Sequence, residues 1–192
     1  MNGKNRNRIG RLLVAALRHD PSLLGIEIDA AGYCSKKEVR TALKEHGYSV
    51  TEEELEEILT NERFGQDKKQ MKVRVDYGTS LGLKLSDMYE TAKTPPAILY
   101  HGTSADALES VKANGIVRFA KNGKKPRDHV FLTERVGIAL KKGRRYGTGV
   151  ALPVLADKMQ KDGYDFYHAK NDIWLTDHIP PQYIDFANMQ FV

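Results

Sequence analysis

Cysteine and long apolar runs are both scarce in this chain of 192 residues. Its one cysteine, Cys34, excludes an internal disulfide and a zinc site built from several cysteines. No apolar run approaches the roughly 20 residues that a helix needs to cross a bilayer. Residues 1–8 are polar and basic, and they lack the apolar core of a signal peptide. We therefore expect a cytoplasmic protein.

Two widespread catalytic motifs are also absent. The chain contains neither HExxH nor GxxxxGK[ST], and its cysteine and histidine residues lack the spacing of a metal site. Metalloprotease and P-loop chemistry therefore find no support, and no bound metal is expected.

Basic residues, in contrast, are in excess. The formal net charge is +5, which favours a polyanionic partner such as nucleic acid, although a basic protein without such a partner fits the charge alone. Charged residues make up 29% of the chain and hydrophobic ones 41%, which is typical of a soluble, globular protein. The length permits one large domain or two small lobes.

The first ninety residues carry the periodicity of short helices followed by a strand. Apolar residues at helical spacing predict a helix over residues 9–19, which Asp20-Pro21 interrupts. Capping boxes that begin at Ser35 and Thr51 predict two more helices, and residues 71–75 alternate as a strand does. Three short helices followed by a hairpin are typical of a winged helix, a common nucleic-acid-binding design, but the strand could equally be scaffold.

Residues 90–96 break both periodicities, and we interpret them as a linker between two lobes. Beyond them, short apolar strands alternate with short helices, which predicts an α+β lobe. Thr103 is expected to cap one of these helices and Thr133 another. The expected strands lie at residues 98–100, 130–132, 150–152 and 173–175.

Four short basic clusters are spread along the chain and indicate a site that binds negative charge. Arginine forks match phosphate oxygens two bonds at a time and keep their proton, which suits phosphate recognition. A glycine next to a histidine lets the backbone approach a ligand closely, because no Cβ intervenes. The clusters therefore suggest an enzyme that acts on phosphorylated substrates. They are Leu17-Arg18-His19, Tyr100-His101-Gly102-Thr103, Arg127-Asp128-His129-Val130 and Gly143-Arg144-Arg145-Tyr146-Gly147.

Each cluster also has a structural explanation. Arg18 and His19 lie in the last turn of a helix, where cations complement the helix dipole. His101 could be a satisfied histidine at the end of a strand, although His129 repeats the arrangement before another strand. Arg144-Arg145, between two glycines, could clamp an oxyanion or simply end a helix.

The ordered set of motifs resembles the RNA (tRNA) 2′-phosphotransferase family. The resemblance covers nearly the whole chain, from about residue 9 to residue 184. In chain order, the motifs that carry it are LRHDP (residues 17–21), VRVDYGTS (73–80), LYHGT (99–103), RDHVFLT (127–133), GRRYG (143–147) and WLTDHIPPQYI (174–184).

This resemblance implies two lobes and one reaction. Residues 1–92 would form a winged-helix lobe that receives RNA, and residues 93–192 an ADP-ribosyltransferase-like lobe that holds NAD as co-substrate. The family removes an internal 2′-phosphate from RNA, such as that left at a ligated tRNA splice junction. The phosphate attacks the nicotinamide ribose, expels nicotinamide and gives ADP-ribosylated RNA. The ribose 2″-hydroxyl then displaces the RNA, which leaves a 2′-hydroxyl and ADP-ribose 1″,2″-cyclic phosphate.

The resemblance also implies which residues act. Arg18 and His19 would bind the RNA 2′-phosphate, while Arg74 and Arg145 would offset charge on the transferred phosphoryl group in the second step. Such work is positioning and charge stabilisation, which needs no metal and no activated side-chain nucleophile. The residues expected to bind NAD are His101, Gly102, Thr103, His129 and Thr133. Three histidines of the family motifs are replaced here by Thr79, Phe131 and Tyr146.

Two other functions are consistent with these residues. A divergent NAD-dependent ADP-ribosyltransferase would stop after transfer to a nucleic-acid phosphate. A non-catalytic nucleic-acid-binding protein would bind in a salt-sensitive way, indifferent to NAD and to a 2′-phosphate. In all three cases we expect a monomer with no membrane partner.

Overall fold

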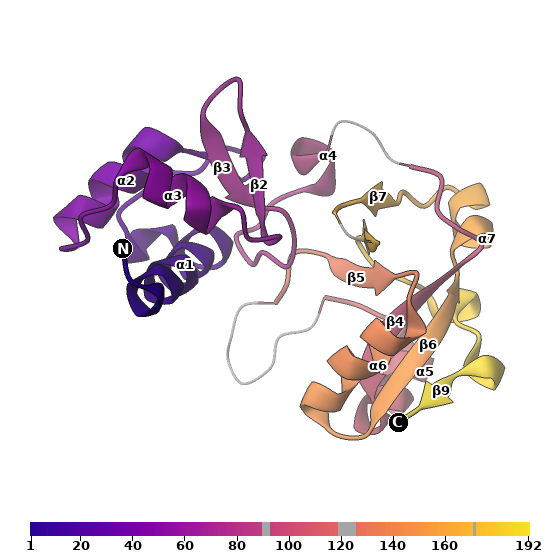
Figure 1. Ribbon diagram of the computed structural model, residues 1–192. Coiled ribbons are helices and arrows are strands. Elements are labelled where there is room, and N and C mark those ends of the chain that lie inside the picture. The colour runs from indigo at the N-terminus through magenta and orange to yellow at the C-terminus, as the bar shows by residue number, and fades with distance from the viewer. Residues whose placement is uncertain (90–92, 119–125, 171) are drawn as a thin grey trace. The chain divides into compact units, whose positions relative to one another are not determined.

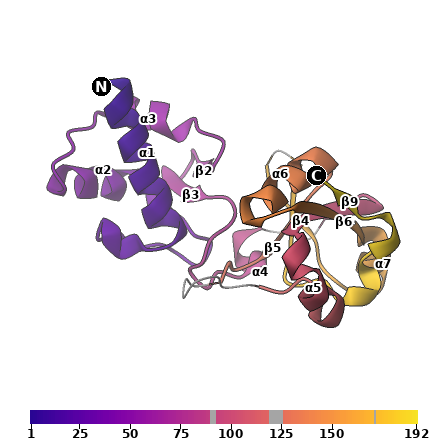
Figure 2. The same ribbon diagram turned by 90° about the horizontal axis from the view of Figure 1, so that it is seen from below.

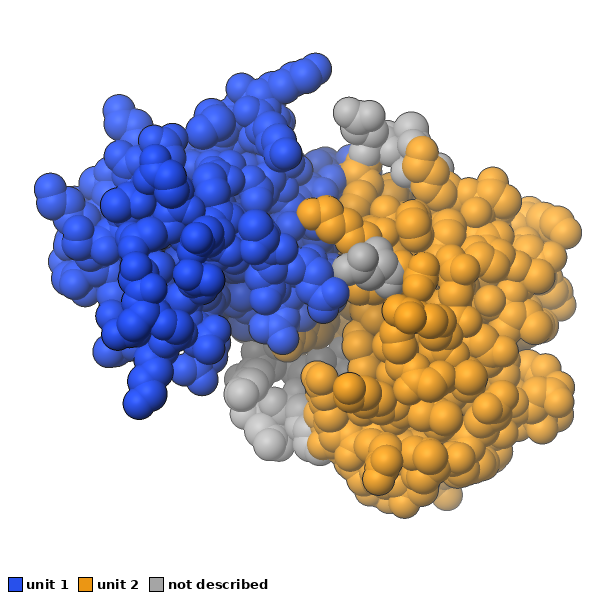
Figure 3. Space-filling view, viewed as in Figure 1, with its two compact units in different colours: residues 1–88 blue, residues 89–192 orange. Residues whose placement is uncertain are grey.

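Two units, Met1–Met88 and Tyr89–Val192, make up the chain in the computed structural model (Figures 1 and 3). The structure describes residues 1–89, 93–118, 126–170 and 172–192. The linker predicted over residues 90–96 begins at residues 90–92, which lie outside the described residues. Within the described parts of the chain, no helix combines the length and the apolar character that crossing a membrane requires.

Helices dominate the first unit, and local capping fixes where two of them begin. Thr51 and Glu54 form a complete capping box, as the sequence predicts. Ser35 also caps its helix by accepting a hydrogen bond from the Glu38 amide, but the Glu38 carboxylate accepts from the amide of Glu27 instead. The helices are α1 (Gly3–Arg18), η1 (Pro21–Leu23), α2 (Lys36–Glu45), α3 (Glu52–Leu59) and α4 (Leu85–Met88).

A three-stranded antiparallel sheet completes the first unit (Figure 1). Its strands, in spatial order, are β1 (Cys34–Ser35), β3 (Lys72–Val75) and β2 (Phe64–Asp67). The sheet and the apolar faces of α1, α2 and α3 share one hydrophobic core, in which Leu13 and Val73 are fully buried. The predicted order of three helices followed by a hairpin is therefore confirmed, while the winged-helix assignment stays a prediction.

One sheet flanked by short helices builds the second unit. Its elements are β4 (Ile98–Ser104), η2 (Ala105–Ala107), α5 (Leu108–Asn114), β5 (Val130–Thr133), α6 (Val136–Gly143), η3 (Arg144–Tyr146), β6 (Gly149–Leu155), α7 (Ala156–Lys161), β7 (Tyr167–His168), β8 (Ile173–Thr176), η4 (Pro181–Tyr183), η5 (Phe186–Asn188) and β9 (Gln190–Phe191). The antiparallel strand order is β7-β8-β5-β4-β6-β9. Helix α6 packs on β4 and β6, and Figure 2 shows α5 on the opposite face of the sheet. The mixture of helices and antiparallel strands confirms the predicted α+β class at this level.

The four predicted strands are confirmed as parts of β4, β5, β6 and β8, but the predicted end of the first is wrong. Strand β4 does not stop before His101. It continues through residues 101–103, because these pair in register with residues 150–152 of β6. The expected arrangement of a strand end followed by a helix therefore begins only after Ser104.

Neither threonine caps a helix as the sequence analysis predicts. Thr103 lies within β4, and the N-cap residues of the helical turns that follow are Ser104 and Ala107, neither of which makes a side-chain cap hydrogen bond. Thr133 comes closer to the prediction, since its Oγ1 accepts a hydrogen bond from the Arg135 amide at 3.2 Å. Arg135 itself is the N-cap position of α6, so the threonine stabilises the turn before that helix and not the helix start.

Gly102 lies where α6 comes closest to β4. A Cβ built at this glycine would overlap the backbone carbonyl of Ala139 in α6. The space that a side chain would fill is therefore occupied by the helix, and this glycine permits close helix–strand packing. The packing of α6 is thus one reason for a glycine at this position, and the interpretation that Gly102 also lets a ligand approach stays a prediction.

Replacing Gly102 by alanine should destabilise the second unit by about 1–3 kcal/mol, the usual cost of overpacking against atoms that cannot move aside. The overlapping atom is the backbone carbonyl oxygen of Ala139, which cannot move aside by a change of side-chain rotamer. Gly137→Ala is the matched control, because Gly137 lies in α6 and, beyond the backbone of its own helix, no atom of the described residues lies within 4 Å of its would-be Cβ. Thermal unfolding should show a lowered midpoint for Gly102→Ala and an equal or slightly raised midpoint for Gly137→Ala. Equal midpoints for the two variants would contradict this packing argument.

Candidate functional site

Arg18 and His19 lie together at the C-terminal end of α1, Arg18 as its last residue and His19 as the C-cap. The Arg18 Nε donates a 2.8 Å hydrogen bond to the carbonyl oxygen of Gly78, and the His19 Nδ1 is bonded to Ser80 Oγ at 2.7 Å. The Ser80 amide in turn donates to the Arg18 carbonyl at 3.0 Å. The turn that follows β3 therefore holds both side chains at the helix end.

Gly78 has a role in this arrangement that its neighbours cannot fill. Its φ of +74° is a left-handed conformation that glycine adopts without strain. A Cβ at this position would overlap the Arg18 guanidinium at Nη2. Beside it, Thr79 is 1% exposed, and among the described residues its Oγ1 has no hydrogen-bond partner. The backbone of this turn thus leaves room for the arginine.

Arg74 is buried in β3 and fixed by several contacts within the first unit. Its Nε donates to Asp76 Oδ1 at 3.1 Å, and its Nη1 donates to the carbonyl oxygens of Ala31 and Met88 at 3.1 and 2.6 Å. The guanidinium carbon also lies 4.6 Å from the centre of the Tyr33 ring, a cation–π distance. Arg74 consequently helps hold its unit together, a role that the sequence analysis did not predict.

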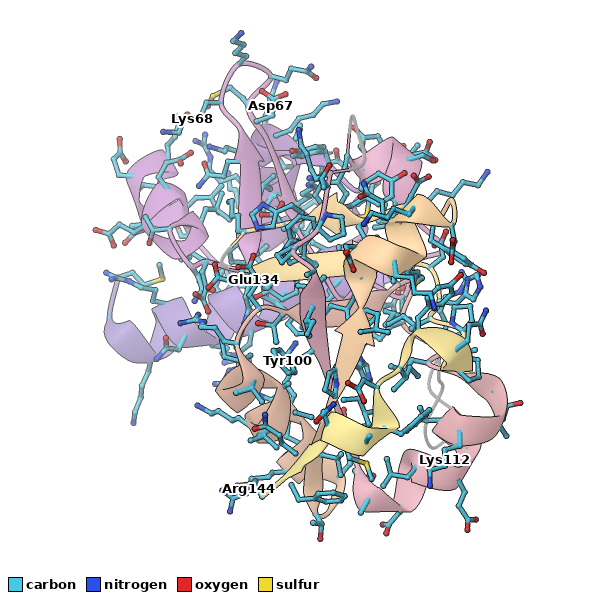
Figure 4. The ribbon with its side chains drawn as sticks, turned by 90° about the vertical axis from the view of Figure 1, so that its right-hand side faces the viewer. Asp67, Lys68, Tyr100, Lys112, Glu134 and Arg144 are labelled. Carbon is cyan, nitrogen blue, oxygen red and sulfur yellow. The ribbon has the colours of Figure 1, made fainter. Side chains whose placement is uncertain are left out.

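In the second unit, the predicted NAD-side residues gather on two neighbouring strands. Tyr100 of β4 pairs with Thr133 of β5, which places His101 next to that pair. The His101 Nδ1 is bonded to the Phe131 carbonyl oxygen at 2.9 Å, and His129 is buried directly before β5. Figure 4 labels Tyr100 on β4 and Glu134 just beyond β5. The structure therefore brings the two predicted motifs side by side.

The surroundings of His101 set its charge and its tautomer. Burial lowers its pKa to about 4; the hydrogen bond to Phe131 opposes this shift, and nearby Lys142 adds to it. The imidazole is consequently neutral at neutral pH. Because a carbonyl oxygen can only accept, Nδ1 carries the proton, and Nε2 presents a lone pair. Among the described residues, no hydrogen bond reaches that Nε2, so it can accept one from a ligand hydroxyl.

The lowered pKa of His101 predicts a pH-dependent stability. The unfolded chain takes up a proton near pH 6.5 and the folded chain only near pH 4, so stability should fall as the pH drops through this window. The shift corresponds to about 3 kcal/mol. Urea unfolding at several pH values should show this extra loss in the parent chain and not in His101→Gln. Identical pH profiles for the two proteins would contradict the assignment.

Arg145 lies on η3, directly after α6, and its side chain is exposed. The turn η3 packs beside β4, and a Cβ at Gly143 would overlap the carbonyl of Thr103. The turn bearing Arg145 is therefore anchored to the same strand that carries His101. Arg144, labelled in Figure 4, is exposed as well. Both guanidinium groups are available to a ligand, as the cluster suggests.

Two features near these residues were missed by the sequence analysis. Lys142 Nζ lies 2.6 Å from the centre of the Phe131 ring, which stands where the family motif has a histidine. Ser80 is hydrogen-bonded to His19. In the sequence, Ser80 is only the last residue of the motif VRVDYGTS, and no role was predicted for it. No local pattern pairs Lys142 with Phe131, since one is on a helix and the other on a strand.

The predicted residues are distributed over both units: Arg18, His19 and Arg74 in the first, and the six others in the second. Guanidinium groups, imidazoles and hydroxyls in such a set are typical of proteins that bind phosphate-bearing ligands. The two units therefore make up an α+β protein whose predicted site residues are of the types that suit a phosphate-bearing ligand. More particularly, the chain belongs to the RNA 2′-phosphotransferase family, Tpt1/KptA, whose family model matches residues 4–178. Membership of this family makes the protein a transferase.

Curated relatives match nearly the whole chain, and each bears the name "Probable RNA 2′-phosphotransferase". The relative from Acaryochloris marina is 33% identical over 91% of this chain and 93% of its own length. The one from Pseudomonas syringae pv. tomato is 34% identical over 96% of each chain. The one from Flavobacterium johnsoniae is 32% identical over 98% of this chain and 100% of its own length. The similarity thus includes both units.

Proposed function

We propose that the protein removes an internal 2′-phosphate from RNA by transferring it to NAD. The products are RNA with a 2′-hydroxyl, nicotinamide and ADP-ribose 1″,2″-cyclic phosphate. The observation that carries the proposal is the Arg18–His19 pair, held by Gly78 and Ser80, in a chain that matches the family over residues 4–178. The names of the relatives support the same activity.

In this proposal, Arg18 and His19 bind the RNA 2′-phosphate. The hydrogen bond from Arg18 Nε to the Gly78 carbonyl oxygen restricts how the planar guanidinium group is oriented. Such a fixed fork binds phosphate oxygens with little loss of side-chain entropy. Residues 1–92 would then be the lobe that receives RNA, in keeping with the predicted winged helix.

NAD is the acceptor, and the second unit offers side chains that fit its ribose. When bound, NAD supplies the ribose carbon that receives the phosphate and the nicotinamide that leaves. The neutral His101 imidazole can accept a hydrogen bond at Nε2 from a ribose hydroxyl. Thr103, His129 and Thr133 complete the proposed NAD site, while Gly102 contributes by letting α6 pack closely. Residues 93–192 would be the ADP-ribosyltransferase-like lobe.

Arg74 and Arg145 are proposed to offset charge on the transferred phosphoryl group. Arg74 is fixed by contacts at Nε and Nη1, so its charge is held in place before the substrate binds. Arg145 is exposed on a short turn of the second unit, where its guanidinium is accessible to a ligand. Neither role requires a metal or a side-chain nucleophile.

The experiment that tests this function compares RNAs that differ in one group. An oligonucleotide with a single internal 2′-phosphate is incubated with the protein, with and without NAD. Two controls carry a 2′-hydroxyl or a terminal phosphate at otherwise identical positions. We expect conversion to 2′-hydroxyl RNA only for the first oligonucleotide and only with NAD. Conversion without NAD, or none with it, would overturn the proposal.

The monomeric state and the cytoplasmic location stay predictions. Light scattering of the purified chain measures the first, and a monomer mass is expected at all protein concentrations used for the assay.

A further inference from the structure

A groove in the first unit is separate from the proposed catalytic residues. It has a volume of about 450 Å³, and α1, the C-terminal end of α3 and the turn into β2 line it. Arginines from each side face it: Arg6 and Arg11 from α1, and Arg63 from the turn. None of the four proposed catalytic residues is among those that line it.

The charges in this groove do not balance. Arg6 is paired with Glu57, whose Oε2 lies 2.6 Å from its Nη2. Among the described residues, no carboxylate lies within 4 Å of the guanidinium of Arg11 or of Arg63, and both side chains are exposed. The groove therefore offers two guanidinium groups that a protein carboxylate does not neutralise, which is suited to two phosphates.

The groove and the proposed 2′-phosphate site share one face of α1. Arg11, Val14 and Arg18 are spaced three and four residues apart, so they lie one above the other along the helix. Arg11 and Arg18 are two turns apart, which is about 10 Å along the axis. A stacked nucleic-acid strand advances about 3.4 Å per nucleotide, so this length corresponds to about three nucleotides or fewer.

Tyr77 links the two places. It lies one residue before Gly78, which holds Arg18, and two residues after β3. Burial and the charge of Glu62 raise the pKa of its phenol, while Arg18 and Arg63 both act to lower it. The charges of both guanidinium groups therefore act on the phenol of Tyr77.

We propose that this groove binds the ribose–phosphate backbone of the RNA next to the 2′-phosphorylated nucleotide, with Arg11 and Arg63 each contacting a backbone phosphate. The proposal rests on the function proposed above, since it places the neighbouring nucleotides of that same substrate. An internal 2′-phosphate has backbone phosphates on both sides, so positive charge next to the reacting group can add to the affinity for the RNA. Affinity would come from the backbone and would carry no sequence preference.

The test uses substrate length and a charge-neutral backbone. A 2′-phosphorylated dinucleotide and a ten-nucleotide RNA with the same central 2′-phosphate are compared in steady-state assays with the parent chain and with Arg11→Gln/Arg63→Gln. The control, Arg40→Gln/Lys44→Gln, removes the same charge from exposed positions of α2, outside the groove. We expect the groove variant to raise the KM of the ten-nucleotide RNA roughly tenfold. The kcat, the KM of NAD and the KM of the dinucleotide should stay unchanged, as should every parameter of the control.

A methylphosphonate scan then identifies the backbone phosphates that the groove contacts. Each backbone phosphate within four nucleotides of the 2′-phosphate is made neutral in turn. In the parent chain, one or two positions should weaken binding, and in the groove variant those same positions should have no further effect. Two results would contradict RNA binding in the groove: an unchanged KM of the groove variant for the longer RNA, or an equal loss of binding affinity in both proteins at every methylphosphonate position. Either result would leave the proposed function unaffected.

The two proposals can fail independently. If the parent chain does not convert the 2′-phosphorylated RNA, the proposed function fails, and binding of the ten-nucleotide RNA without NAD still tests the groove. Fluorescence anisotropy at several salt concentrations should give a log–log slope lower by about two in the groove variant, one for each phosphate that the variant no longer binds. If the groove variant and the control variant have equal slopes, the groove does not bind the RNA backbone.

Discussion

The Arg145→Ala variant is expected to remove 2′-phosphate about 10²–10³-fold more slowly than the parent chain, the usual cost of deleting one group that stabilises developing charge. Arg145 is exposed on η3, so its removal leaves no buried partner behind and the fold should persist. Because its proposed task is the second step, ADP-ribosylated RNA should accumulate in this variant. Rapid quench followed by gel separation of the RNA species measures both effects.

Arg144→Ala is the matched control for this experiment. Arg144 is the neighbouring residue on the same turn, it is exposed, and it carries the same charge. A general loss of positive charge would slow both variants equally, whereas the proposed role slows only Arg145→Ala. Full product formation by Arg145→Ala would exclude Arg145 from the reaction. A rate loss without accumulation would place its action in the first step.

The Gly78→Ala variant is expected to lose at least about tenfold in 2′-phosphate removal, because a misplaced binding group costs far more in rate than in stability. The new Cβ would overlap the Arg18 guanidinium, which is the flexible end of its side chain and would move away. The left-handed backbone at Gly78 adds about 1–2 kcal/mol of strain. The activity should therefore fall mainly through a higher KM for the phosphorylated RNA.

Gly82→Ala separates strain from displacement. Gly82 has nearly the same backbone conformation, φ +81° against +74° at Gly78, but apart from its chain neighbours no atom of the described residues lies within 4 Å of its would-be Cβ. The two variants should lose similar stability in thermal unfolding, and only Gly78→Ala should lose activity. Equal activities in the two variants would show that Arg18 does not depend on the room that Gly78 provides.

Local features of this fold could be predicted from the sequence. The end of α1 before Asp20-Pro21 and the capping box at Thr51 depend on residues within a few positions of one another, and both are confirmed. The alternation of residues 71–75 likewise identified β3. Such patterns act through neighbouring backbone groups, so no tertiary information is needed to recognise them.

Features made by distant residues could not be predicted. Arg74 is fixed by Ala31, Tyr33 and Met88, which come from separate parts of the first unit, and no spacing in the sequence relates them. The continuation of β4 past His101 depends on pairing with β6, some fifty residues later. The backbone of α6 next to Gly102 is equally remote, and it gives that glycine a packing role that the sequence could not predict.

The roles of the site residues came from the family motifs, and the structure adds the physical reasons for some of them. Gly78 and Ser80 show why the turn after β3 matters to Arg18 and His19. The hydrogen bond to the Phe131 carbonyl oxygen defines the tautomer of His101. The sequence of the motif does not contain that information. The motif order was therefore more informative about function than charge or spacing alone.

The fate of the phosphorus atom tests the central claim most directly. RNA with ³²P in one internal 2′-phosphate is incubated with NAD and the protein, and the labelled species are separated. We predict that the label leaves the RNA and appears in ADP-ribose 1″,2″-cyclic phosphate, in equal amount to the nicotinamide released. Label that appears as inorganic phosphate, or that stays on ADP-ribosylated RNA, would contradict the account.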